Sequence, residues 1–381
     1  MPFLSKGLYA QSDKAPVVIA GAQPLTGIFS FAGVDMHRGL DEYVKWQNAN
    51  GGIAGRPLRY VFEDTGFKLD QGVAVVKKLM ASDKPNFFYI DGTPLVKATA
   101  RDLQESGHVM STSTSCAEVL CDPVNMPQHF LASPTYASML SILMEHISRQ
   151  AKGGAKPTVA LVYSDTEFGR DGIPGAKARA EKLGIPIVLE IVTKQSGIDV
   201  APEVARLRRA RPDYVIFQGY VLAPIPEFVK QMTEAGLKSQ VLGTIWSMSA
   251  VTYNALAALN ADWMGVMPYA YGHDKDSKSM ADIRKQFAAA YPDVKDVSPF
   301  VVHGWLSGMI FGEIARRCIT ADKPLTLPNM QAALKSITAM DTGGISGLPV
   351  NLSSHQIASG RLYRLNQGTK QMDPASDWIA L

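Results

Sequence analysis

Short apolar runs alternate, along most of the chain, with segments in which apolar residues recur every three or four positions. The first pattern is typical of buried strands, and the second of helices that cover a sheet. Strands are expected at 17–22, 58–63, 86–90, 109–112, 130–132, 158–163, 187–191, 214–218 and 241–244. Helices are expected at 70–80, 95–106, 136–151, 169–183, 200–210 and 226–235, after a first helix that carries Met36, Leu40 and Tyr43. Repeated strand–helix units with short loops predict an α/β fold with doubly wound parallel sheets.

The length of 381 residues exceeds what one hydrophobic core usually holds, so two lobes are expected. With 46% hydrophobic residues the chain has the composition of a well-buried globular protein. Two adjacent α/β lobes leave a cleft that faces the carboxyl ends of both sheets. Ligands bind at such edges in open α/β folds, so we expect a binding site there.

The net charge of +3 is nearly neutral for this length and gives no support for nucleic-acid binding. The basic run within 206–211 is typical of one solvated helix face. No stretch is long and apolar enough to span a bilayer. Residues 1–14 do not look like a folded element, and we interpret them as a residual export or linker segment. Leu8-Tyr9-Ala10 has the small-residue look of a signal-peptidase site, without the charged and apolar regions that should precede it.

The three cysteines suggest an oxidising compartment. Cys116 and Cys121 lie close together in a loop rich in Ser and Thr, and a small disulfide between them is expected. Cys318 falls in an apolar helical segment and is expected to be a buried free thiol. The alternative is three inert thiols. No Cys/His spacing supports a zinc site.

No catalytic motif stands out. There is no GxSxG elbow, no GxGxxG and no phosphate loop, so neither an enzyme nor a cofactor is predicted. The histidines are scattered singly; His303, before Gly304-Trp305, is the one to check because its helix is expected to be buried. Two loops that follow strands, 91–95 and 112–115, are rich in Gly, Thr and Ser, which either bind an anion or cap the next helices.

The segment from Pro24 to Asp64 resembles the opening of type I periplasmic solute-binding proteins, the branch that serves branched-chain amino acid and related ABC importers. Its pieces, in order, are PLTG (24–27), Gly33 with Arg38-Gly39, NANGGIAGR (48–56) and Glu63-Asp64. YSDTEFGRDG (163–172), FQGY (217–220) and the late GGISGLPVNLSSHQ extend the resemblance over most of the chain.

The resemblance implies two Rossmann-like lobes that the chain joins through three hinge segments, at 132–135, 266–270 and 345–350. Lobe 1 is then 15–133 plus 271–344, and lobe 2 is 134–268 plus 349–381. It also implies a periplasmic location, a small-molecule solute and an inner-membrane ABC permease as partners, and no chemistry on the solute.

The resemblance further implies that the two strand-end loops of lobe 1 bind the carboxylate of the ligand. The matching residues of this chain are Thr93, Pro94 and Leu95 in the first loop, and Ser113, Thr114 and Ser115 in the second.

From lobe 2 the resemblance implies contacts by Phe168, where the family often has Tyr, and by Tyr220. Amino-acid binders of this branch carry an acidic residue in the loop that matches 243–248, whereas this chain reads GTIWSM, with Trp246. A buried ammonium without a counter-charge is costly, so we expect a ligand without an α-amino group.

Aromatic residues complete the predicted site. Phe29 and Phe31 in the first turn, with Trp246, Phe168 and Tyr220, could enclose a flat ring, although Phe29 or Phe31 could equally fill the core of lobe 1. Tyr269 is a candidate for the hinge side of the cleft. The leading hypothesis is a binding protein for an organic acid with an aromatic or apolar body. A branched-chain amino acid, amide or urea binder, a ligand-sensing regulator and an enzyme are the alternatives.

Overall fold

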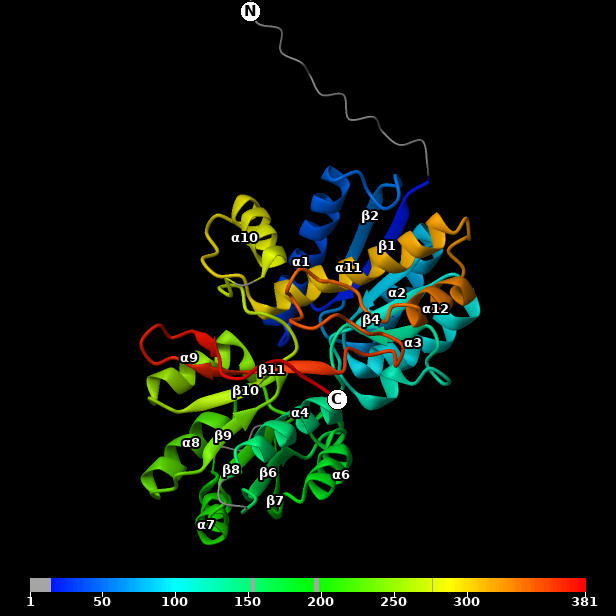
Figure 1. The fold of residues 1–381 in the computed structure, drawn as a ribbon. Coiled ribbons are helices and arrows are strands. Elements are labelled where there is room, and N and C mark those ends of the chain that lie inside the picture. The colour runs from blue at the N-terminus through cyan, green and yellow to red at the C-terminus, as the bar shows by residue number, and fades with distance from the viewer. Residues whose placement is uncertain (1–14, 152–154, 195–198, 276) are drawn as a thin grey trace, which may run out of the picture.

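The computed structural model describes residues 15–151, 155–194, 199–275 and 277–381. Residues 1–14, interpreted above as an export or linker segment, lie outside these ranges. The chain forms two α/β lobes built on separate sheets (Figure 1). Among the helices of the described ranges, none combines the length and the apolar composition needed to cross a membrane.

The sheet of lobe 1 has five parallel strands in the order β2-β1-β3-β4-β5. Its strands are β1 (Val17–Gln23), β2 (Leu58–Asp64), β3 (Phe87–Ile90), β4 (Met110–Ser113) and β5 (His129–Leu131). The helices that follow these strands are α1 (Ser30–Ala49), α2 (Leu69–Asp83) and α3 (Thr93–Ser106), and a 3₁₀ helix, η1 (Glu118–Cys121), follows β4. The parallel strand–helix alternation that the sequence predicts is confirmed in this lobe.

Three helices from late in the chain return to lobe 1. They are α10 (Lys278–Ala290), α11 (Pro299–Thr320) and α12 (Leu327–Lys335), drawn in yellow and orange beside the blue and cyan elements in Figure 1. Helix α11 packs along α1 at glycines: a Cβ on Gly39 would lie 2.0 Å from the carbonyl oxygen of Val301, and one on Gly304 would lie 2.1 Å from that of Met36. Only glycine permits so close a crossing.

The sheet of lobe 2 has eight strands, with β12-β11-β10-β9-β8-β6-β7 in sequence across it and β13 paired to β11. Strands β6 to β10 run parallel, and β11 joins β10 antiparallel. Their bounds are β6 (Val159–Ser164), β7 (Ile187–Thr193), β8 (Tyr214–Gln218), β9 (Gln240–Gly243), β10 (Trp263–Met267), β11 (Ser359–Leu365), β12 (Met372–Pro374) and β13 (Ile379–Ala380).

The helices of lobe 2 are α4 (Tyr136–Arg149), α5 (Glu167–Arg170), α6 (Ile173–Leu183), α7 (Ala201–Ala210), α8 (Ile225–Glu234) and α9 (Ala250–Ala258), with a 3₁₀ helix, η2 (Ile245–Met248). The single helix expected at 169–183 is in fact two, because Pro174 lies in the first turn of α6. A proline fits the first turn of a helix, where no backbone N–H is needed, and not its interior.

The expected disulfide between Cys116 and Cys121 is wrong, since both are free thiols. The Cys116 thiol lies 3.0 Å from the carbonyl oxygen of Thr114 and donates to it, and it is 3.2 Å from the Ser133 hydroxyl. The Cys121 thiol donates to the carbonyl of Glu118, inside η1, at 3.3 Å. The two thiol groups are therefore directed toward different backbone carbonyl groups and not toward each other. Cys318 is also buried and free.

Candidate functional site

A cavity of ≈ 260 Å³ lies where the two lobes meet, at the carboxyl ends of their parallel strands. Its walls come from the loops after β1, β2, β3 and β4 in lobe 1, and from α4, the loop after β6, α5 and η2 in lobe 2. The lining residues are Phe29, Phe67, Asp91, Gly92, Thr93, Pro94, Ser115, Ala117, Tyr136, Thr166, Glu167, Phe168 and Trp246. The cavity therefore occupies the place that the strand order of an open α/β fold predicts for a ligand.

Aromatic rings from both lobes form most of the cavity wall. Phe29 lies against Phe67 with ring centroids 4.2 Å apart, and the edge of Phe29 meets Trp246 at 5.9 Å across the junction of the lobes. Tyr136 and Phe168 lie 5.0 Å apart on the lobe 2 side. Such a wall favours an apolar or aromatic body over a polar one.

Trp246 also anchors the wall to the core of lobe 1. Its ring stacks on Phe300, in the first turn of α11, with centroids 5.4 Å apart and an angle of 29°. Its indole N–H donates to the Tyr136 hydroxyl at 3.1 Å. One side chain of lobe 2 therefore contacts two rings of lobe 1, and these contacts hold the lobes together over the cavity.

Hydrogen-bond donors converge at one end of the cavity, at the start of α3. This helix has no side-chain cap, and because Pro94 has no N–H, the backbone N–H groups of Thr93 and Leu95 are the ones in its first turn that can meet an anion. The Gly92 N–H donates to the Ser115 hydroxyl at 3.1 Å, which leaves the hydroxyl hydrogen of Ser115 to donate further. Gly92 has φ of 97°, a conformation that glycine adopts readily and that brings the backbone around to the cavity.

The Tyr136 hydroxyl is a further donor. It accepts from the Trp246 indole N–H, so its own hydrogen remains for another acceptor. Burial raises the pKa of Tyr136 well above its ordinary value, and the hydroxyl therefore keeps its proton.

Asp91 is a buried carboxyl in the cavity wall, only 4% exposed. The Thr114 hydroxyl donates to one of its oxygens. Burial raises the pKa of Asp91, while hydrogen bonds from Thr114 and the Gly92 backbone offset part of the rise. The described residues that line the cavity include no Lys, Arg or His. The acidic groups in the described lining are thus Asp91, which follows β3, and Glu167 of α5, and neither comes from the 243–248 loop.

An ion pair crosses the rim of the cavity. Lys97 of α3 pairs with Glu167 of α5, and their side chains are 42% and 55% exposed. Exposed pairs of this kind contribute little to stability because water and salt screen them. A second link between the lobes is the Glu118 N–H, which donates to the Asp171 carboxylate at 3.0 Å.

The structure brings together half of the site residues that the sequence analysis named. Those that line the cavity are Phe29, Thr93, Pro94, Ser115, Phe168 and Trp246. The others lie behind the wall or beside it. Phe31 packs edge-on against Phe300 at 5.8 Å, and Leu95 belongs to the core beneath α3.

The remaining named residues do not line the cavity. The Ser113 hydroxyl lies 3.2 Å from the His129 ring, and Thr114 supports Asp91. The Tyr220 hydroxyl bonds that of Thr193 at 2.8 Å, and Tyr269 is fully buried. His303, singled out from the sequence, is also fully buried, and its Nδ1 lies 2.6 Å from the Tyr89 hydroxyl.

Several lining residues were not named from the sequence. They are Phe67, Asp91, Gly92, Ala117, Tyr136, Thr166 and Glu167. Each lies within five residues of the end of a strand, so examining every strand-end loop in the same way would have found them. Phe67, for example, lies three residues after β2, with φ of 56°.

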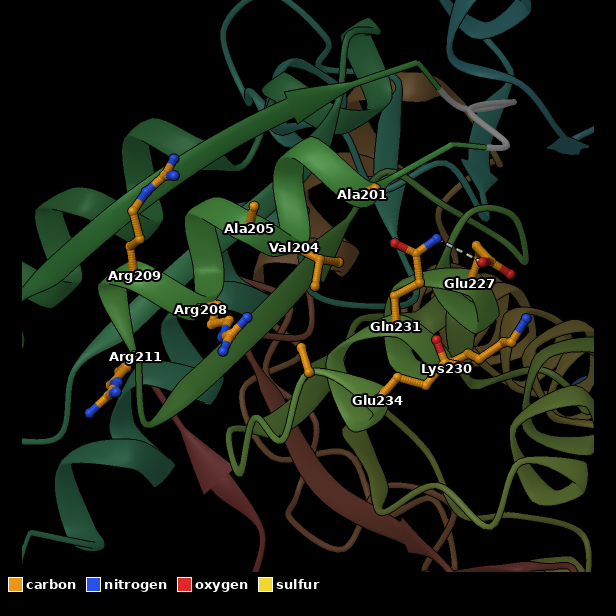
Figure 2. Close-up of a pocket in the computed structure, with 11 residues that line it drawn as sticks. Ala201, Val204, Ala205, Arg208, Arg209, Arg211, Glu227, Lys230, Gln231 and Glu234 are labelled. Carbon is orange, nitrogen blue, oxygen red and sulfur yellow. Dashed lines mark hydrogen bonds between the residues drawn. The ribbon is translucent and has the colours of Figure 1, made fainter.

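Helices α7 and α8 lie at the end of lobe 2 that is farther from lobe 1 (Figure 1). A larger hollow, of ≈ 1150 Å³, is lined by residues of these two helices (Figure 2). It is an open groove with charges of both signs. Figure 2 shows Arg209 and Arg211 pointing to one side and Lys230 to the other, so the cationic groups do not converge on a point. This groove is the solvated basic face that the sequence predicted, and the interlobe cavity is the better candidate site.

Comparison with known proteins agrees with this architecture. Residues 16–368 match the family model described as periplasmic binding protein. The chain is 23% identical over 253 residues to Leu/Ile/Val-binding protein homolog 3 of Brucella melitensis, a match that covers 66% of this chain and 67% of that protein.

Two solved structures share the fold. A branched chain amino acid ABC transporter protein from Thermus thermophilus with bound valine is 21% identical, with a TM-score of 0.79 and 96% of each chain covered. A solute binding protein from Rhodopseudomonas palustris in complex with 3,4-dihydroxy benzoic acid is 17% identical, with a TM-score of 0.75, and the match covers 96% of this chain and 98% of that one.

Proposed function

Because this chain belongs to the periplasmic binding protein family, we propose that it binds a small carboxylate with an aromatic or apolar body and delivers it to an ABC permease. The family supplies the general role of a solute-binding component that acts outside the cytoplasmic membrane. The class of solute is the specific part of the proposal, and it rests on the interlobe cavity.

The observation that carries the proposal is the division of the cavity into an aromatic wall and a donor end. Five rings face the space: Phe29, Phe67, Tyr136, Phe168 and Trp246. At the other end, the start of α3 and the hydroxyl of Ser115 offer N–H and O–H groups. A carboxylate satisfies several donors at once, and a helix N-terminus favours a negative charge. The volume of ≈ 260 Å³ suits a ligand about the size of a substituted benzoate or a short fatty acid.

The 243–248 loop supports the same class of ligand. It forms β9's last residue and η2, and it places Trp246 against the cavity without any acidic side chain. Nothing in this loop would neutralise an ammonium group held beside it.

An amino acid is the second candidate, and one observation favours it. Asp91 lies in the cavity wall and, if ionised, could pair with an ammonium group on the ligand. Among solved relatives of the same fold, one carries valine and another a dihydroxybenzoate, so the fold accommodates both classes.

A thermal-shift panel on ligand-stripped protein separates these candidates. The panel comprises benzoate, 4-hydroxybenzoate, phenylacetate and hexanoate as acids, benzamide and urea as neutral controls, and leucine and phenylalanine as amino acids. A ligand that binds only the folded state raises the melting temperature by mass action. We expect shifts with one or more acids and none with benzamide, which has the ring of benzoate without the charge. Shifts confined to the amino acids, or no shift with any acid, would overturn the proposal.

A pair of serine variants then tests the location. Ser115→Ala removes a donor from the cavity and should weaken binding of the best acid about 10- to 150-fold, since a hydrogen bond to a charged group contributes about 1.5–3 kcal/mol. Ser106→Ala lies at the opposite end of α3, where its hydroxyl bonds the Leu103 carbonyl, and serves as the matched control. Equal affinities for the two variants would place the ligand elsewhere.

A further inference from the structure

Asp91 has no obvious place in a site that binds an anion. It lies at the end of β3, directly before the first turn of α3, on the same side of the cavity as the Ser115 hydroxyl. A ligand carboxylate held by the donors at this end therefore comes close to the carboxyl of Asp91. Two ionised carboxylates side by side in a buried space repel each other strongly.

The surroundings of Asp91 do not supply a compensating cation. The titratable groups nearest to it are Tyr89 on its own strand, Cys116 after β4 and Tyr136 at the start of α4, and none of these carries a positive charge. Two lysines lie in the neighbourhood. Lys68 lines a small adjoining cavity together with Asp91, but its side chain is exposed to water, and Lys97 is paired with Glu167, which lines the interlobe cavity. Neither lysine is a buried counter-charge for two carboxylates at this end of the cavity, whereas a shared proton removes their repulsion.

We propose that Asp91 meets the carboxylate of the ligand as a neutral carboxylic acid, so that this residue selects acids over amino acids and binding of an acid takes up a proton. The inference rests on the proposed function, since it requires an acid ligand. In the complex the O–H of Asp91 donates to a ligand oxygen, while the Thr114 hydroxyl donates to the other oxygen of Asp91.

The chemistry balances with water as the proton source. Above the pKa of Asp91 in the free protein, binding transfers one proton from solvent to the carboxyl pair, and release of the ligand returns it. Burial raises the pKa of Asp91 in the free protein, which lowers the free-energy cost of protonating it when a ligand carboxylate approaches. Two carboxyl groups that share one proton titrate as a pair, so the uptake belongs to both together.

Isothermal titration calorimetry of the full-length protein with the best acid from the panel tests this directly. Titrations at one pH in buffers of different ionisation enthalpy count the protons that are bound with the ligand. At pH values above the pKa of Asp91 in the free protein, we expect the uptake of close to one proton per ligand bound. In the same pH range the dissociation constant should rise about tenfold per pH unit. An uptake of zero with an affinity that does not change with pH would overturn the inference while leaving the proposed function intact. If no acid binds, both fail.

Two variants sharpen the test. Asp91→Asn keeps a neutral donor of the same shape, so it should bind the acid with no proton uptake and without the pH dependence of the parent protein. Asp102→Asn, at an exposed position on α3, removes one carboxylate far from the cavity and should behave like the parent. If Asp91→Asn instead abolishes binding of an amino acid that the parent binds, Asp91 acts as an ionised counter-charge and the inference is wrong.

Discussion

Replacing Trp246 should lower the affinity for the ligand more than it lowers the stability of the ligand-free protein. Trp246 belongs to lobe 2, but its ring stacks on Phe300 and meets the edge of Phe29, both in lobe 1. Its N–H also donates to Tyr136. The two ring contacts across the junction exist only while the lobes are together, so their loss falls on the closed, ligand-bound form.

The magnitude follows from the contacts. Each aromatic pair contributes about 1 kcal/mol beyond simple burial, and a neutral hydrogen bond contributes about 1 kcal/mol. The hydrogen bond to Tyr136 lies within lobe 2 and is lost from the open and closed forms alike, so only the two ring pairs count toward closure. Trp246→Ala loses both pairs, about 2 kcal/mol, which corresponds to an increase of about 30-fold in the dissociation constant. Trp246→Phe keeps a ring at the same place and loses only the bond within the lobe, so a much smaller increase is expected.

Calorimetric titration of the best ligand measures these ratios, and thermal denaturation without ligand measures the effect on the free protein. Trp46→Phe is the matched control, because Trp46 packs on Tyr43 and Trp305 away from the cavity and should leave affinity unchanged. If Trp246→Ala binds within threefold of the parent protein, the ring contacts between the lobes contribute nothing to closure, and the reasoning is refuted.

Three further predictions concern stability and reactivity. Gly39→Ala should lower the free energy of unfolding, measured by urea denaturation, by about 1–3 kcal/mol, because a Cβ at this position meets a backbone carbonyl of α11. An unchanged denaturation midpoint would contradict the close contact between the two helices. A thiol reagent should leave Cys116 and Cys121 unmodified in the native protein, because burial raises the pKa of each thiol to about 12. After denaturation without reductant the reagent should detect three free thiols. Detection of only one would mean that Cys116 and Cys121 form a disulfide. Burial lowers the pKa of His129 and of His303 to about 3. Below the ordinary histidine pKa of about 6.5, the unfolded chain therefore binds more protons than the folded protein does. The free energy of unfolding should fall as the pH falls from about 7 to about 5.5, by up to about 1.4 kcal/mol per pH unit for each histidine. A flat profile in urea titrations over that range would argue against the buried neutral form.

The parallel sheets could be predicted from the sequence because the residue patterns that indicate each strand and helix lie within that segment of the chain. Most strands before position 244 are short and largely apolar, and most helices repeat an apolar face within a few turns. The antiparallel addition of β11 to β10 was not predictable in this way. It pairs Val266 with Leu362, and nothing in the composition of either strand names a partner so far along the chain.

The candidate site was predictable at the level of loops and not of side chains. Phe29 and Phe31 are two residues apart, yet one lines the cavity and the other packs against Phe300. Tyr220 lies two residues after β8, at the expected edge of the sheet, but its hydroxyl is bonded to that of Thr193. Such choices depend on rotamers and on how the second lobe approaches, and both are set by the folded structure as a whole.

The crossing of α1 by α11 has a consequence for how the chain can be divided or synthesised. The face of α1 that carries Met36 and Leu40 is completed by a helix that begins at Pro299, some two hundred and fifty residues later. A nascent or truncated chain that stops before Pro299 would therefore present an uncovered apolar stripe to chaperones, to proteases or to other copies of itself. Gene fragments cut between the sheets should be insoluble alone, and co-expressing the 271–344 segment should rescue the N-terminal piece.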